Sequence, residues 1–145
     1  RTCRLEGTYT ADLVLARGNL YTLTGRVTIG GDNENSATLY VDPGVTIVGD
    51  STDDFLVISR GSMIMAEGTN NSPITLTAGL DITGTPAENA RGLWGGLVLN
   101  GNAPINDCPE GATGGTEACV KEGEADSGLL AAPVSGELAS SLVDP

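Results

Sequence analysis

The chain has 145 residues, enough for one domain with a sizeable core, yet aromatic residues make up 3% of it and glycine fills 21 positions. A core of aliphatic side chains with frequent tight corners is typical of a β-solenoid rather than a helical bundle. The net charge of −12, from 7 basic and 19 acidic residues, disfavours a nucleic-acid partner, because phosphate neutralisation requires Lys and Arg. No apolar run approaches the roughly 18 residues of a membrane span.

Residues 1–20 form the first predicted segment. It contains the apolar residues Leu5 and Tyr9, followed by the short apolar run of residues 13–15. We expect one or two short strands here, which cap or begin a stack, and a turn at Gly18.

Residues 21–107 repeat. Pairs of apolar residues recur along this stretch, and their second members are evenly spaced except for a longer last step, in the series Leu23, Val41, Ile58, Leu76, Leu99. A second column holds Ile29, Ile47, Ile64, Ile82 and Ile105. A regular step with apolar residues in phase predicts stacked units that bury their faces on one another. We therefore predict an all-β, right-handed parallel β-helix of about five coils, with an irregular C-terminal extension. The longer last step predicts a loop inserted before Trp94.

Three motifs carry a family resemblance over roughly residues 5–107. They are PGVTI at 43–47, the GT and SPI of residues 68–74, and WGGLVLNGNAPIN at 94–106. The sequence resembles secreted or cell-surface bacterial β-helix proteins of marine proteobacteria and Bacteroidetes, a largely uncharacterised family. The resemblance implies a right-handed parallel β-helix, export and an extracellular or cell-surface location. It supplies no catalytic residues.

Residues 108–145 form the loop-rich extension. Cys108 and Cys119 flank a stretch rich in Gly, Pro, Thr and acidic residues, and we predict a disulfide between them, because a flexible loop gains stability from a cross-link. Two free thiols are the alternative. Cys3 could pair with either of them, pair outside the chain or remain free.

Acidic and amide side chains recur in the predicted turns. Asp32, Asn33, Asp50, Asp53 and Asp54 are candidate Ca²⁺ ligands, since calcium takes six to eight oxygen ligands. If the turns stack, Asp53 lies over Asn70, one predicted coil further along. The same coil length places Asp42 beside Arg60 and predicts a surface ion pair there. The alternative is that Asp and Asn simply favour turns.

The sequence favours a structural or adhesive role over an enzyme. It has no His for serine catalysis and few basic residues to serve as the proton acceptor of a lyase. We predict an extracellular β-helix protein that associates with copies of itself, as a filament subunit, or continues into a longer chain through its coil ends. The alternative is a carbohydrate-binding or polysaccharide-cleaving module with a glycan partner. Trp94 is a candidate for stacking on a sugar, or for packing on the inserted loop.

Overall fold

The computed structural model describes residues 1–105, 108–114, 116, 118–119, 121–122 and 130–131. It is built mainly of parallel strands, with one short helix, α1 (Gly79–Thr83). The strands of the coils are β1 (Thr2–Tyr9), β2 (Leu13–Leu15), β3 (Leu20–Ile29), β4 (Thr38–Val41), β5 (Thr46–Gly49), β6 (Phe55–Ile58), β7 (Met63–Ala66), β8 (Thr75–Ala78) and β9 (Gly96–Leu99). Two further short strands, β10 (Lys121–Glu122) and β11 (Leu130–Ala131), pair antiparallel outside the coils.

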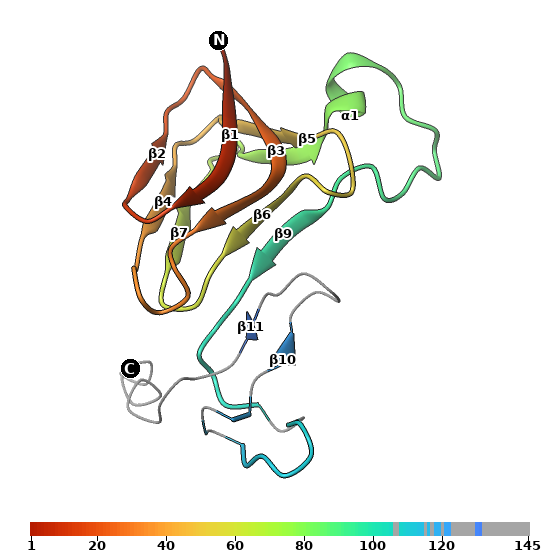
Figure 1. Ribbon diagram of the computed structural model, residues 1–145. Helices are drawn as coiled ribbons and strands as arrows, with labels where there is room; N and C mark the ends of the chain where they lie inside the picture. Colours follow the sequence, from red (N-terminus) through yellow and green to blue (C-terminus); the bar gives the residue numbers. More distant parts are fainter. Residues whose placement is uncertain (106–107, 115, 117, 120, 123–129, 132–145) are drawn as a thin grey trace.

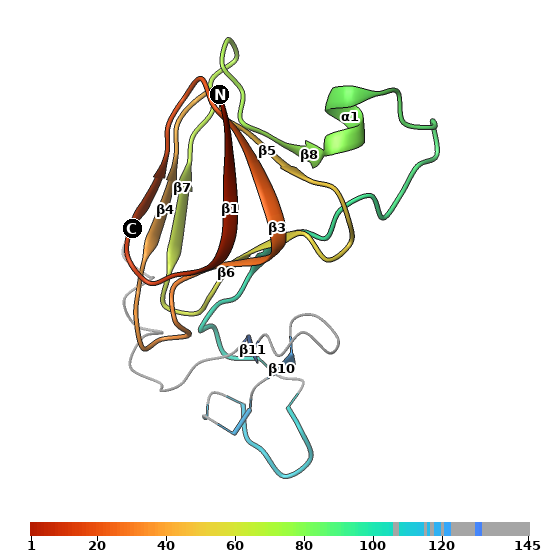
Figure 2. The same ribbon diagram turned by 45° about the horizontal axis from the view of Figure 1, so that its top comes forward.

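The described strands stack in four layers around one interior (Figures 1 and 2). The first layer holds β1 and β2, and the second holds β3 and β4. The third contains β5, β6 and β7, and the fourth contains β8 and β9. One wall is the sheet β2-β4-β7, and the other is the six-stranded sheet in which β3 pairs with β1 on one side and with both β5 and β6 on the other. The chain is therefore a parallel β-helix, as the sequence predicts.

The core is made of columns of mainly aliphatic side chains, and each column takes one residue from each of three or four successive layers. Strand register defines five columns: Cys3–Tyr21–Ile47–Leu76, Gly7–Val27–Leu56–Leu97, Tyr9–Ile29–Ile58–Leu99, Leu13–Leu39–Ile64 and Leu15–Val41–Ala66. Side chains in the middle layers, such as Ile29, Leu39 and Leu56, are completely buried. Each fully buried side chain of this size contributes about 1.5–3 kcal/mol, so the middle layers supply most of the stability.

Three corners separate the strands, and one of them changes most from layer to layer. In β3 this corner is a bend at Gly25, whose φ of 62° is a conformation that favours glycine. In the third layer it is the turn of residues 50–54. In the fourth it is the connection of residues 79–95, which contains α1 and projects away from the coils (Figure 1). The two strands on either side still keep their register on the layer before.

The predicted register of the repeat is wrong, although the fold class is right. The series from Leu23 to Leu99 passes through β3, β4, β6, β8 and β9, so its members lie on different walls rather than in one column. The true step is longer, because Leu13 pairs with Leu39, and Leu39 with Ile64. As a result, the described residues form four layers rather than about five. Ile82, predicted in the interior, lies on α1 and is 50% exposed.

The starting strands of residues 1–20 begin the stack, since β1 pairs along its whole length with β3. Most of the predicted extension after residue 107 lies outside the described residues. Among the described residues, no helix is long and apolar enough to span a membrane.

Candidate functional site

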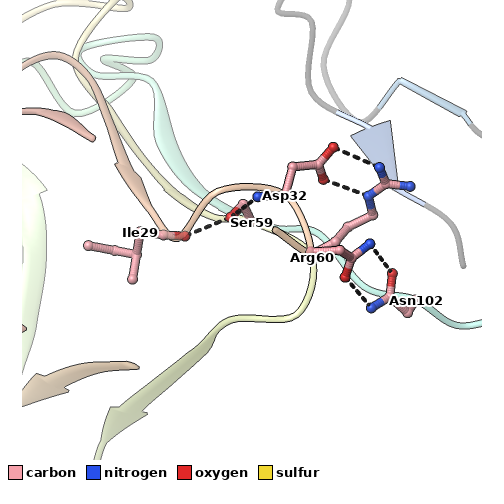
Figure 3. Close-up of polar contacts among 6 residues, drawn as sticks. Ile29, Asp32, Ser59, Arg60 and Asn102 are labelled. Carbon is pink, nitrogen blue, oxygen red and sulfur yellow. Dashed lines mark hydrogen bonds and ion pairs between the residues drawn. The ribbon is translucent and has the colours of Figure 1, made fainter. Parts of the chain in front are cut away.

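The corner between β3 and β4 gathers polar side chains from three layers (Figure 3). The guanidinium of Arg60 donates two hydrogen bonds to the carboxylate of Asp32, at 2.6 Å from Nε and 2.7 Å from Nη2. The hydroxyl of Ser59 donates to the carbonyl oxygen of Ile29 at 2.8 Å and accepts from the backbone N–H of Asp32 at 3.2 Å. These contacts hold the turn after β3 against the turn after β6.

A second contact at this corner reaches the chain after β9. The side-chain amides of Asn33 and Asn102 exchange two hydrogen bonds, at 3.2 and 2.8 Å. The ion pair raises the pKa of Arg60 above its ordinary value, chiefly through the hydrogen bond to Asp32, so the guanidinium stays charged. Arg60 is almost buried, at 5% exposed, and such a charge requires a partner. The polar contacts at this corner therefore hold successive layers together.

The predicted ion pair of Arg60 with Asp42 is wrong. The carboxylate of Asp42 accepts from the backbone N–H of Arg17 at another corner, after β4. The error has the same cause as the register error, since both take the spacing of the series from Leu23 to Leu99 as the length of one coil.

Asp54 organises the other acidic turn, between β5 and β6. Its carboxylate accepts from the backbone N–H of Gly25, at 2.7 Å, and from that of Asp50, at 3.0 Å. Burial raises the pKa of Asp54, but hydrogen bonds from Gly25, Asp50 and Ser51 outweigh it, so the pKa lies below its ordinary value. This carboxylate therefore supplies an acceptor at the bend of β3, where the Gly25 amide takes part in no strand pairing.

The predicted ladder of calcium ligands along one edge is not formed. Asp32 and Asn33 lie at the corner after β3, whereas Asp50, Asp53 and Asp54 lie in the turn between β5 and β6. The carboxylates of Asp32 and Asp54 already accept hydrogen bonds from protein donors. No group of three or more His, Cys, Asp or Glu residues suited to a metal occurs in the part of the chain that the structure describes. Calcium binding itself stays a prediction.

A hollow lies where the inserted connection returns to the coils. It has a volume of about 460 Å³ and is lined by Trp94, by α1 and the loop after it, and by the end of β8. Asp81, Glu88 and Arg91 contribute charged groups to its lining. We call this hollow the Trp94 pocket. A smaller hollow of about 240 Å³ lies beside Phe55 and Val98 and is also lined by Trp94.

The sequence identifies Trp94 as a candidate but misses the charged residues of the pocket. The signal that could have found them was the long step before Leu99, since loops that lengthen one turn of a regular repeat often carry function.

The disulfide prediction is confirmed. Cys108 and Cys119 are bonded, with 4.7 Å between their Cα atoms. Within the described residues Cys3 is a free, partly buried thiol packed against the core. The bond closes the loop after the last described coil.

Parallel coils with aliphatic columns define the class of β-helix proteins. A family model described as a pectate-lyase-like β-helix domain matches residues 7–130, and the chain belongs to that family. Comparisons with curated proteins and with solved structures find no match. The matched span includes the insertion before Trp94, and the family is compatible with either an enzyme or a non-enzymatic protein.

Proposed function

We propose that the chain is a structural module of an extracellular β-helix, which associates end to end with a second copy through its last described coil. The carrying observation is the exposure of core columns at that end. In the column Val27–Leu56–Leu97 the first two side chains are fully buried and Leu97 is 39% exposed. In the neighbouring column, Ile58 is 3% exposed and Leu99 is 61% exposed.

The two ends of the stack differ. In the first layer Leu5 and Leu15 are buried, at 5% and 0% exposed. In the last layer Leu76 is only partly buried and Leu97 and Leu99 are exposed, so inward-directed aliphatic side chains meet water. Contact of this apolar surface with another coil or with a partner would remove it from water and so be favourable.

The strand edges support a second copy as the partner. Among the described strands, β8 and β9 pair only with β5 and β6, so their outer edges are available for pairing. At the other end, β3 is the one described strand that pairs with β1, and β1 is long enough to span both halves of a layer. The β1 edge of one copy can therefore continue the stack below β8 and β9 of another. Such a contact is heterologous and leads to chains of copies.

The extracellular location is supported by the disulfide. Cys108–Cys119 is a bond of the kind that persists in oxidising compartments.

Oligomer size measured against protein concentration tests the proposed association. Sedimentation velocity or light scattering should show species that grow with concentration, and Leu97→Lys together with Leu99→Lys should return the protein to a monomer. The matched control is Val14→Lys with Met63→Lys, because these side chains are 58% and 59% exposed on the outer wall. A wild-type chain that stays monomeric up to millimolar concentration contradicts the proposal, as does equal behaviour of the two double variants.

A further inference from the structure

The Trp94 pocket is built by the only layer whose corner is strongly enlarged among those described. Where β3 bends at Gly25 and the third layer turns through residues 50–54, the fourth layer inserts residues 79–95. The insertion has internal order. The backbone N–H of Gly84 donates to the carbonyl of Leu80 at 2.9 Å, and that of Ala90 donates to the carbonyl of Ala87 at 2.8 Å. The strand pairing of the coils does not depend on this insertion, so the insertion is available for another function.

The indole of Trp94 is held in place by the coils. Trp94 is half-buried and packs against the core. The next residue, Gly95, donates its N–H to the carbonyl of Asp54 at 3.0 Å. A Cβ at Gly95 would lie 2.6 Å from the carbonyl oxygen of Thr52 and 2.7 Å from the Cβ of Phe55, so only glycine allows this approach. Trp94 therefore lines both hollows from a position that the core and the closely packed backbone at Gly95 fix.

Polar groups surround the ring on the insertion side. The carboxylate of Asp81 accepts a hydrogen bond from the hydroxyl of Thr77 at 2.9 Å, which orients it so that its other oxygen can accept from a ligand. Glu88 and Arg91 are exposed at the rim. The lining thus combines one aromatic face, two hydrogen-bond-accepting carboxylates and one donating guanidinium.

We propose that the Trp94 pocket binds a neutral pyranose unit of a glycan. The apolar face of a sugar ring packs on the indole, and its hydroxyls donate to Asp81 and Glu88 and accept from Arg91. The volume of about 460 Å³ is within the range of small-molecule sites. Acidic sugars are disfavoured twice, because the lining has more carboxylates than cations and the chain carries a net charge of −12.

Fluorescence gives a direct test, because Trp94 is the only tryptophan of the chain. Excitation at a wavelength selective for tryptophan reports the pocket alone. Neutral hexasaccharides of glucose, mannose and galactose and an oligogalacturonate are titrated separately at constant ionic strength. We expect a saturable emission change and reduced acrylamide quenching with at least one neutral hexasaccharide. The oligogalacturonate should bind at least tenfold more weakly.

Rim variants assign the binding to the pocket while leaving the reporter intact. Glu88→Gln and Arg91→Ala should each weaken the neutral glycan at least fivefold without changing the melting midpoint, since both residues are exposed. The control is Glu34→Gln, an exposed carboxylate on the turn after β3, which should bind as wild type. Calorimetry on Trp94→Ala should show no binding.

Three results would overturn the proposal. The first is the absence of any emission change with all neutral hexasaccharides. The second is equal or tighter binding of the oligogalacturonate, which would place an acidic glycan in the pocket. The third is equal affinity of Glu88→Gln and Glu34→Gln, which would place the sugar elsewhere on the surface.

Discussion

Leu56 and Leu97 offer the sharpest test of the layered core, because they are the same residue type in one column at different depths. Leu56 is completely buried between Val27 and Leu97, which is 39% exposed in the last described layer. Leu56→Ala removes three buried carbon atoms, Cγ and both Cδ, and leaves a cavity, for a cost of about 2–5 kcal/mol. Leu97→Ala loses only part of the free energy of burying a leucine side chain and leaves no closed cavity, for a cost of about 1 kcal/mol.

Urea unfolding followed by circular dichroism measures both costs. The midpoint of Leu56→Ala should fall clearly below that of Leu97→Ala, with similar slopes against denaturant. In thermal melts, a loss of about 3 kcal/mol in a chain of this size lowers the midpoint by roughly 6–12 °C. The measurement is made at a concentration where the protein is monomeric. Equal losses in the two variants would refute the reasoning, because they would mean that Leu97 is as well covered in the monomer as Leu56.

Three further predictions concern register, acid stability and calcium. Tyr40 and Met65 are outward-facing partners on β4 and β7. In a chain without the free cysteine, Tyr40→Cys with Met65→Cys should therefore form a disulfide, whereas Tyr40→Cys with Met63→Cys should not. Mass spectrometry of unreduced peptides distinguishes the two results. Asp54 has a lowered pKa, so its stabilisation is present above about pH 4 and is lost as the pH falls through its folded pKa. Asp54→Asn should therefore cost about 1–2 kcal/mol near pH 6 and less near pH 3, and a pH-independent cost in urea titrations would contradict this. If Ca²⁺ binds the turn of residues 50–54, a chelator should lower the melting midpoint, and equal midpoints with Ca²⁺ and with chelator would rule out a stabilising site.

The fold class was predictable because aliphatic residues recur in phase and glycine interrupts them. The register was not, because a coil contains up to three strand segments that carry similar aliphatic patterns. Leu23 and Val41 have the same local pattern, yet one lies on β3 and the other on β4. Most inward positions are aliphatic, so composition does not distinguish which segments stack. The spacing between two such segments therefore looks like the length of a whole coil.

The polar corners show the consequence of that ambiguity. The correct step brings Asp32 beside Arg60, whereas the shorter step brings Asp42 there instead. Sequence alone recognises that Asp and Asn residues occupy turns, but the choice of partner depends on which turns lie above one another. The Cys108–Cys119 bond was predictable because both cysteines belong to one local loop and do not depend on the register.

In this small protein the residues proposed to bind a ligand lie in the enlarged corner, apart from the columns that stabilise the fold. Gly25, the turn of residues 50–54 and the connection of residues 79–95 occupy equivalent places in successive layers, while the strands around them keep their pairing. The hydrogen bonds that satisfy a parallel strand come from its neighbours in the stack, so a corner can lengthen without disturbing them. Trp94 lies where the insertion rejoins the coil and lines the pocket, and the next residue, Gly95, is hydrogen-bonded to the turn of residues 50–54. Substitutions in the pocket rim should therefore change ligand affinity without changing stability, whereas substitutions in the columns should do the reverse.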